Sequence, residues 1–287
     1  SNERCGWDPC SASSLPRNFG PTSSTPFNEV WPVSSIGSPD ADPAAHYHAS
    51  GQTAVPAHDD WLTPPEADRL NSMRYTKRRD ESRLGRWTAK HAVARALDLP
   101  RTSAQLRDVV IRNAKDGAPE AFIGRDPASV AISMTDRAGW AVCVVAGGVA
   151  AVGCDLELVE PRSRLFVRDY FTPAEQDTVA ASPDDHDLLA NLIWSAKESA
   201  LKVLREGLRL DTRTVEVTLD DERHAGWSAL VVTTSSGERF PGWWTRHGDF
   251  VLTYCATGTT GAPIAMDDPS PLATATPTHS WMQTPLR

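Results

Sequence analysis

Residues 152–158 read VGCDLEL, and this stretch sets the expectations for the rest of the chain. Its apolar residues predict a buried strand, on which successive side chains point to opposite faces. Asp155 and Glu157 therefore share one face, while Cys154 and Leu156 point into the core. Two carboxylates on one face repel each other, and Mg²⁺, or Mn²⁺ as an alternative, relieves that repulsion because it prefers oxygen ligands and is shared with substrate phosphates. A solvated strand face that carries both acids is the competing interpretation.

A second stretch with acidic and basic residues follows at 194–202, WSAKESALK. Apolar residues recur at helical spacing from 187 to 206, which predicts an amphipathic helix. On it, Glu198 and Lys202 are four residues apart, and an ordinary surface ion pair at that spacing contributes only about 0.3–0.5 kcal/mol. The other interpretation is that Glu198 completes a three-carboxylate metal site with the two strand acids. Lys202 would then lie beside the anion that the metal holds.

The central part of the chain predicts an α+β fold with two similar-sized lobes, 58–150 and 151–260. Each lobe combines a helical stretch with short strands; in the first lobe the helical pattern covers 66–97. Gly147-Gly148 stands between two apolar runs and predicts a hairpin. The expected strands are 129–134, 139–146, 149–158, 214–219, 227–234, 239–244 and 249–256.

Both ends of the chain differ in composition from the centre. Residues 1–57 and 261–287 are rich in Ser, Pro, Ala, Gly and Thr and have no sustained period. Such segments bury too little apolar surface to offset the entropy of ordering them. We therefore expect an N-terminal and a C-terminal tail, either poorly structured or extended along the folded body.

Composition excludes several classes of protein. The 287 residues carry a formal net charge of −8, which argues against a general nucleic-acid binder. No apolar run approaches the ~20 residues that a membrane helix needs, and no signal peptide is visible. The five cysteines form no CxxC pair, and those in apolar runs are typical of buried residues in a reducing compartment. We therefore expect a cytoplasmic protein that binds neither nucleic acid nor membrane.

A basic cluster precedes the acidic motifs. Arg79, Arg83, Arg86 and Lys90 are spaced by 4, 3 and 4 residues and so share one helical face. A face with one sign of charge is often simply solvated. Four bases on one face also match the charge of a ligand that carries several phosphates.

Three motifs together carry a resemblance to a known family. VGCDLE, then FTPAE at 171–175, then WSAKESALK resemble the signature of the 4′-phosphopantetheinyl transferases of the surfactin-synthetase-activating type. The resemblance covers about 66–256. It implies two α+β lobes related by a pseudo-two-fold axis, with coenzyme A in the cleft between them. It also implies a reaction, in which the phosphopantetheine arm of coenzyme A moves to a serine of an apo carrier protein and 3′,5′-ADP leaves.

The resemblance implies roles for individual residues. Asp155, Glu157 and Glu198 would bind Mg²⁺, and Glu198 would be the base for the carrier serine. Lys202 would stabilise the leaving phosphate. The contacts to coenzyme A would come from Arg69, Arg79, Arg86, Lys90, Thr135, Arg137, Lys197 and Lys202. The carrier would be an acyl, polyketide or peptidyl carrier, such as those of secondary-metabolite synthesis, and two lobes in one chain predict a monomer.

Two departures fall on the nucleotide contacts. Asp136 stands where the family commonly has a histidine that contacts the 3′-phosphate, and Ala118 stands where it commonly has a cation. Arg137 and the basic face of 79–90 are the expected compensation. One alternative function is a non-catalytic homologue that binds coenzyme A or a carrier protein. Another is an Mg²⁺-dependent nuclease, which the acidic composition disfavours.

Overall fold

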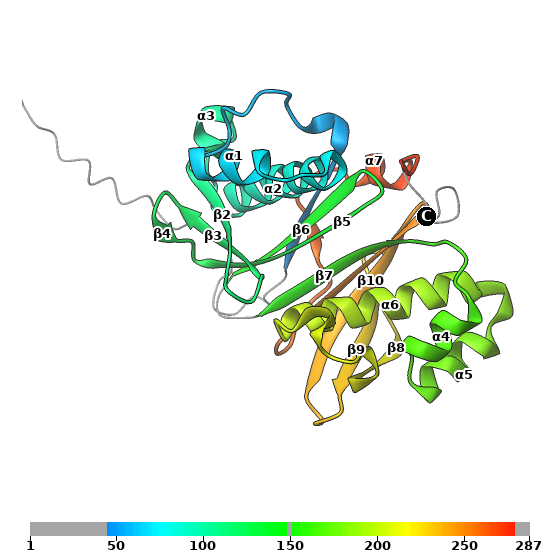
Figure 1. The fold of residues 1–287 in the computed structure, drawn as a ribbon. Helices are drawn as coiled ribbons and strands as arrows, with labels where there is room; N and C mark the ends of the chain where they lie inside the picture. The colour runs from blue at the N-terminus through cyan, green and yellow to red at the C-terminus, as the bar shows by residue number, and fades with distance from the viewer. Residues whose placement is uncertain (1–44, 148–150, 279–287) are drawn as a thin grey trace, which may run out of the picture. The chain divides into compact units, whose positions relative to one another are not determined.

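The computed structural model describes residues 45–147 and 151–278, which all lie in one compact unit that spans Ser34–Arg287. The expected α+β class is confirmed: antiparallel sheets are covered by helices on their outer faces (Figure 1). Strand pairs are antiparallel except for one short parallel pair near the chain ends.

The first sheet has the strand order β12-β1-β6-β5, and α2 (Thr76–Ala96) packs on one face of it. Ala89 and Val93 of α2 are buried in the same cluster as Cys143 of β6, because small residues on this helix face allow close packing. The strands are β12 (Ile264–Ala265), β1 (His46–Gly51), β6 (Trp140–Gly147) and β5 (Val130–Arg137). A small third sheet beside it contains β2 (Val109–Asn113), β3 (Pro119–Ile123) and β4 (Asp126–Pro127).

The second large sheet has the strand order β7-β11-β10-β9-β8, and α6 (His186–Val203) packs on it. The buried face of α6 carries Leu192, Ile193 and Leu201, as its apolar stripe predicts. The strands are β7 (Val152–Leu158), β8 (Val215–His224), β9 (Trp227–Thr234), β10 (Arg239–His247) and β11 (Phe250–Ala256). The other helices are α1 (Pro64–Asn71), α3 (Ser103–Leu106), α4 (Arg164–Tyr170), α5 (Pro173–Ala181) and α7 (Ser270–Ala273), with short 3-10 helices at Gln52–Ala54, Pro183–Asp185, Gly207–Arg209 and Thr212–Thr214.

The two large sheets face each other between α2 and α6, so that the layers run helix, sheet, sheet, helix (Figure 1). The core between the sheets contains Tyr47 of β1, Val144 of β6, Cys154 and Leu156 of β7, and Tyr254 of β11. Full burial of one such large apolar side chain contributes about 1.5–3 kcal/mol. Because Cys154 and Leu156 point into this core, the alternate residues of β7 face α6.

The expected hairpin at Gly147-Gly148 is wrong. β6 pairs with β1 and β5, whereas β7 pairs with β11 of the other sheet. β5 and β7 still lie side by side, but side-chain hydroxyls join them in place of a backbone ladder. Ser133 Oγ accepts a hydrogen bond from the Cys154 N–H at 3.0 Å, and Thr135 Oγ1 accepts one from the Leu156 N–H at 3.2 Å. The two sheets therefore meet along β5 and β7.

The tail boundaries also need correction. Residues 1–44 and 279–287 lie outside the described residues, but 46–51, which we placed in the N-terminal tail, form β1 next to β6. Residues 264 and 265, placed in the C-terminal tail, pair with β1 as β12. β1 is short and its buried residues do not alternate, so it does not stand out in a segment rich in Ser and Pro. The pairing with β6 stabilises the strand.

Candidate active site

The acidic residues of VGCDLEL lie where β7 passes under α6. Gly153 allows this, because a Cβ on it would overlap the backbone carbonyl of Ser199. Glycine is thus needed for the close approach of helix and strand. Ser195 and Ser199 of α6 also hydrogen-bond to Thr253 of β11, which fixes the helix on the sheet. Asp155 and Glu157 consequently face α6, the helix that carries Glu198 and Lys202.

The Asp155 carboxylate is bound by side chains from two elements, β5 and α6. Its Oδ1 accepts a hydrogen bond from Thr135 Oγ1 at 3.1 Å and pairs with Lys202 Nζ at 2.9 Å. Lys202 Nζ also donates to the carbonyl of Cys154 at 2.8 Å. Burial lowers the pKa of Lys202, but the charge of Asp155 outweighs this and the net shift is upward, so the ammonium is retained at neutral pH.

Glu198 lies on the same side of β7 with a carboxylate that is incompletely paired. Its Oε1 is buried and has no hydrogen-bond partner among the described residues, and neither has Asp155 Oδ2. Burial raises the pKa of Glu198 to about 7, and the charge of Asp155 adds to this. A carboxylate left buried and unpaired is costly, so these two oxygens mark a place built for a cation or a proton donor.

Glu157 has a different environment. Its Oε2 pairs with Arg137 Nε at 3.2 Å and with an Arg162 side-chain nitrogen at 3.2 Å. Arg162 also donates to Asn191 on α6 at 2.6 Å. Burial and the charge of Asp155 raise the pKa of Glu157 to about 7, while both arginines act in the opposite direction. Glu157 was expected to bind the metal, and the contact with Arg162 was not expected from the sequence.

These carboxylates fit a divalent cation in part. Across residues 45–147 and 151–278, no group of three or more His, Cys, Asp or Glu side chains is already arranged to hold a metal ion. Asp155 Oδ2 and Glu198 Oε1 nevertheless are buried, unpartnered oxygens of the kind that Mg²⁺ prefers. Glu157 would have to loosen its contacts with two arginines before it could join them. Asp155 and Glu198 therefore fit the cation better than Glu157 does.

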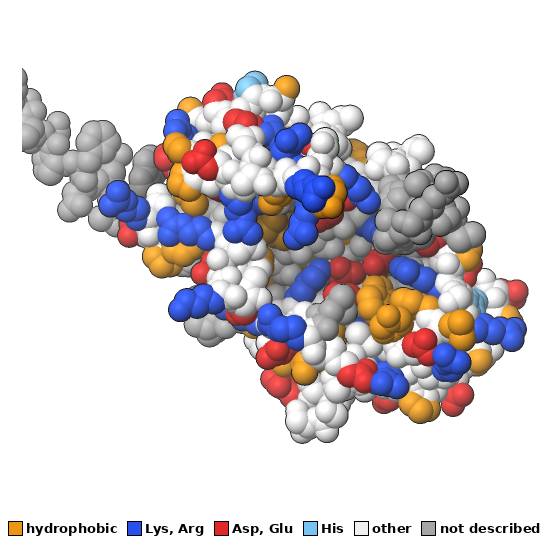
Figure 2. Space-filling model, in the orientation of Figure 1, with side chains coloured by type: hydrophobic (Ala, Val, Ile, Leu, Met, Phe, Trp, Pro, Cys, Tyr) orange, Lys and Arg blue, Asp and Glu red, His pale blue; other side chains and the backbone are white. Residues whose placement is uncertain are grey.

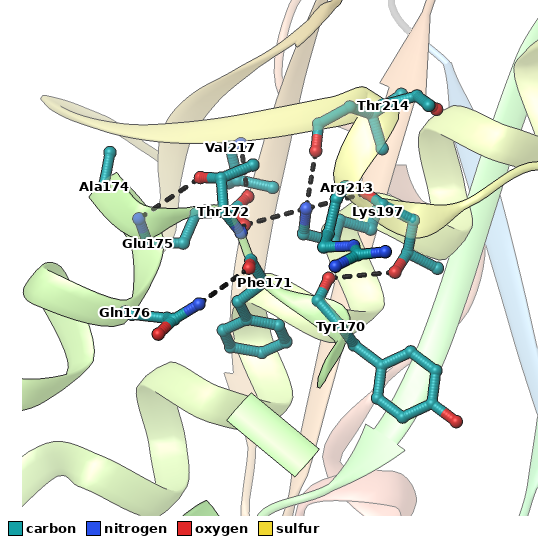
Figure 3. Close-up of polar contacts among 12 residues, drawn as sticks. Tyr170, Phe171, Thr172, Ala174, Glu175, Gln176, Lys197, Arg213, Thr214 and Val217 are labelled. Atoms are coloured by element: carbon teal, nitrogen blue, oxygen red, sulfur yellow. Dashed lines mark hydrogen bonds and ion pairs between the residues drawn. The ribbon is translucent and has the colours of Figure 1, made fainter. Parts of the chain in front are cut away.

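Lys197 does not belong to the site, contrary to expectation. Its side chain is fully buried and pairs with Glu175 Oε2 at 2.8 Å, as Figure 3 shows. It also donates to the Thr212 carbonyl at 2.9 Å and to the carbonyl of Val215 at 2.5 Å. All three ammonium protons thus have partners inside the core, and none can reach a phosphate.

Lys90 occupies the same kind of position in the first lobe and needs the same correction. It is fully buried and pairs with Glu66 Oε2 at 2.9 Å. Glu66 accepts from the Thr63 and Ile111 backbone N–H groups, just as Glu175 accepts from Thr172 and Val217. The sequence carries this repeat as TPPE with WTAK and as TPAE with WSAK, a signal that our sequence analysis did not use.

Part of the chain, including the strand and helix that carry this site, is similar to known proteins. Residues 151–255, which contain β7, α6 and β11, match the family model of the 4′-phosphopantetheinyl transferase superfamily. A 4′-phosphopantetheinyl transferase of Bacillus subtilis is 26% identical over 182 residues, 57% of this chain and 74% of the relative. The crystal structure of a holo-[acyl-carrier-protein] synthase from Neisseria meningitidis aligns with 38% of this chain and 100% of its own at 18% identity, with a TM-score of 0.32.

The other residues expected to bind coenzyme A have mixed placements in the structure. Thr135 supports Asp155 and Leu156 rather than facing an open space. Arg86 is buried, and burial lowers its pKa. Arg79 is half-buried on α2 and Arg69 is exposed at the end of α1. Among these four, Arg69 and Arg79 retain the access that a ligand requires.

A cavity of about 1360 Å³ opens beside the transferase motifs. Its lining includes Ser133 and Met134 of β5, Val152 of β7, Lys202 of α6 and Ala118 of the β2–β3 turn. Most of this lining is apolar, with Lys202 as a charged group at the end nearest the buried acids. Concave apolar walls with few polar groups are typical of ligand sites.

None of the helices in the described ranges is long and apolar enough to cross a membrane.

Tertiary structure also gives His48 a carboxylate partner that sequence analysis did not identify. His48 Nδ1 pairs with Asp267 Oδ2 at 2.9 Å, and Ser50 Oγ lies 3.0 Å from His48 Nε2. Ser50 is only 5% exposed, so its hydroxyl is not accessible to a substrate. His48 stacks on His91 of α2, with ring centroids 5.8 Å apart. The group therefore packs α2 onto β1.

Proposed function

We propose that this chain transfers the 4′-phosphopantetheine arm of coenzyme A to a serine hydroxyl of an apo carrier protein and releases 3′,5′-ADP. The observation that carries the proposal is the buried pair of unpartnered carboxylate oxygens, Asp155 Oδ2 and Glu198 Oε1, beside Lys202. These residues lie within the stretch that matches the transferase superfamily. The reaction forms a bond from the serine oxygen to the phosphorus that carries pantetheine, and breaks the bond from that phosphorus to the oxygen of 3′,5′-ADP.

Glu198 is the group that we propose accepts the serine proton. Glu198 and Asp155 are the carboxylates of this site that have a buried oxygen with no hydrogen bond to the described residues. Asp155 is already held by Thr135 and Lys202, so it is less free to move a proton. A base must lie within hydrogen-bond reach of the proton it accepts, and Glu198 on α6 is the better placed of the two.

Lys202 is the group that we propose stabilises the leaving phosphate. A lysine has three N–H donors, and two of them bind the Cys154 carbonyl and Asp155 Oδ1. The same side chain lines the cavity, so the third donor is available to a ligand there. Donors that are already oriented cost little reorganisation when charge develops on the leaving oxygen.

Asp155 and Glu198, with Glu157 as a third candidate, would hold the Mg²⁺ that we expect. A bound divalent cation would neutralise charge on the diphosphate. Arg137 and Arg162 keep the Glu157 carboxylate in place on β7.

We further propose the surfactin-synthetase-activating type, acting as a monomer on acyl, polyketide or peptidyl carriers. Support comes from the three sequence motifs and from the presence of both helix-covered sheets in one chain.

The test is the intact mass of apo carrier proteins after incubation with the full chain, coenzyme A and Mg²⁺. We expect a mass gain of one phosphopantetheine, abolished by EDTA and restored by added Mg²⁺. A panel of acyl, polyketide and peptidyl carriers would define the specificity. Binding of coenzyme A without modification of any carrier would contradict the proposal and favour the non-catalytic alternative.

A further inference from the structure

The cavity that Lys202 lines continues beyond the end of α6, where the chain contributes two more cations. Arg205 and Arg209 line it from the segment after α6, and Asp116 and Glu120 line it from the opposite side. Asp116 lies in the turn between β2 and β3, and Glu120 lies on β3, both in the first lobe. Figure 2 shows Lys and Arg side chains on both sides of the hollowed band of the surface.

Arg205 is held across the cavity by weak contacts, since it lies 3.4 Å from Asp116 Oδ2 and 3.6 Å from Glu120 Oε1. Arg209 donates to the Asp116 backbone carbonyl at 3.3 Å and to the Arg205 backbone carbonyl at 2.6 Å. It also lies 3.5 Å from Glu206 Oε2. The side chain of Arg205 is 50% exposed. Long ion pairs in contact with water contribute little to stability, so a stronger acceptor can replace the carboxylates.

The backbone places Arg205 where arginine is not locally favoured. Arg205 follows the C-cap residue Leu204 and has a φ of 58°, the left-handed conformation that glycine adopts without strain. Its N–H binds the Lys202 carbonyl at 3.1 Å, which closes the end of the helix. A strained non-glycine residue at a cavity points to a role for its side chain outside the helix end.

We propose that Arg205 and Arg209 bind the 3′-phosphate of coenzyme A, and that Arg205 exchanges its contacts with Asp116 and Glu120 for that phosphate. The inference rests on the proposed function. Coenzyme A carries its third phosphate on the ribose next to the diphosphate, and Lys202 marks the diphosphate end of the cavity. Arg205 follows Lys202 by three residues, just beyond the end of α6, and both side chains line the same cavity. Guanidinium groups bind phosphate through paired N–H donors, more strongly than they bind a half-solvated carboxylate.

The experiment compares coenzyme A with 3′-dephospho-coenzyme A, which lacks only the 3′-phosphate. Equilibrium dissociation constants of both are measured calorimetrically in Mg²⁺ for the wild-type chain and for Arg205→Ala combined with Arg209→Ala. We expect the wild type to prefer coenzyme A. In the double variant, affinity for coenzyme A should fall about tenfold or more, and affinity for the dephospho ligand should change less than about twofold.

Arg213→Ala is the matched control. Arg213 is similarly exposed and paired with a carboxylate, Asp211, but it does not line this cavity. Its removal should leave both dissociation constants unchanged. Asp116→Asn keeps the acceptor for the Ala118 N–H but removes the competing charge, so it should tighten coenzyme A binding about two- to fivefold and leave the dephospho ligand nearly unaffected.

The outcomes separate this inference from the proposed function. If the double variant lost affinity for both ligands equally, or lost affinity for neither, the proposed role of the arginines would be overturned. Transfer activity of the wild type would still support the proposed function in that case. A wild-type chain that binds neither ligand would overturn the proposed function and the inference together.

Discussion

The Ser199 carbonyl on α6 lies directly over Gly153 on β7, at a separation that leaves no room for a Cβ. This contact fixes the distance between α6, which carries Glu198 and Lys202, and the strand that carries Asp155. We predict that Gly153→Ala lowers the free energy of unfolding by about 1–3 kcal/mol, because the helix must move away from the strand. It should also lower transfer activity, since the acids separate from the lysine. Urea unfolding and initial rates measure the two effects.

Gly85→Ala is the control for that substitution. Gly85 lies inside α2, and an added Cβ would meet only the flexible end of Met134, at 3.2 Å. Alanine favours a helix interior by about 0.5–1 kcal/mol over glycine, so stability should be unchanged or slightly raised. If Gly153→Ala proved as stable as the wild type, the helix would not be held by this contact.

Glu198→Gln should abolish most transfer activity while the fold persists. Removal of one proton-transfer group typically costs a factor of about 10²–10⁴. The free energy of unfolding should stay level or rise slightly, because the buried, unpartnered carboxylate is replaced by a neutral amide. Initial rates and urea unfolding are measured side by side, with Glu238→Gln, an exposed acid away from the cavity, as the control. A fully active Glu198→Gln protein would contradict the role assigned to this residue.

Lys202→Ala should lower turnover by at least about tenfold, because the leaving phosphate loses its donor and Asp155 loses its partner. A surface ion pair contributes less than 1 kcal/mol, which is less than a tenfold effect. The measurement is kcat at saturating coenzyme A and carrier. Lys77→Ala removes the lysine of an exposed ion pair with Glu81 and should leave kcat unchanged. An unchanged rate for Lys202→Ala would reduce Lys202 to an ordinary ion-pair partner.

Lys197→Met should act on stability rather than on chemistry. It leaves the Glu175 carboxylate buried without its cation, and the loss of one partner of a buried pair costs about 3–5 kcal/mol. Lys90→Met, which leaves Glu66 unpaired, should cost a similar amount in the first lobe. Urea unfolding gives the stability, and kcat per folded molecule should stay within about threefold of the wild type. A large selective loss of kcat in Lys197→Met would restore a direct role for Lys197.

Stability at mildly acidic pH should depend on His91. Burial lowers the pKa of His91 to about 4, and the nearby His48 and Arg101 lower it further while Asp267 opposes them. Because the folded-state pKa is below the unfolded value of about 6.5, this contribution is complete above about pH 6.5 and is lost as pH falls toward 4. With allowance for solvent screening, the loss is of the order of 1–3 kcal/mol.

The measurement is urea unfolding at pH 7.5 and at pH 5 for the wild type and for His91→Gln. Carboxylates with raised pKa values, such as Glu175, act in the opposite direction, but they are common to both proteins. The difference between the two proteins therefore isolates His91. Parallel pH dependences would show that His91 is protonated equally in the folded and unfolded states.

The sequence alone determined the class of fold, the strand that carries Asp155 and the helix that carries Glu198 and Lys202. These follow from local periodicity, because a strand alternates and a helix repeats within the span of a motif. The three motifs also led to the family that residues 151–255 match. The repeated TPxE and WxAK stretches were present as well, and they would have indicated the two buried Lys–Glu pairs.

Only the tertiary structure decided which charged residues are available to a ligand. Lys197 and Lys202 lie in the same motif on α6. Lys197 nevertheless points into the core toward Glu175, whereas Lys202 points toward β7. Likewise, three contacts join segments that are separate in the chain: the ion pair of Arg137 with Glu157, the pairing of β1 with β6, and the contact of Arg205 with Asp116. Burial and charge pairing depend on what packs against a side chain, and the local pattern does not contain that information.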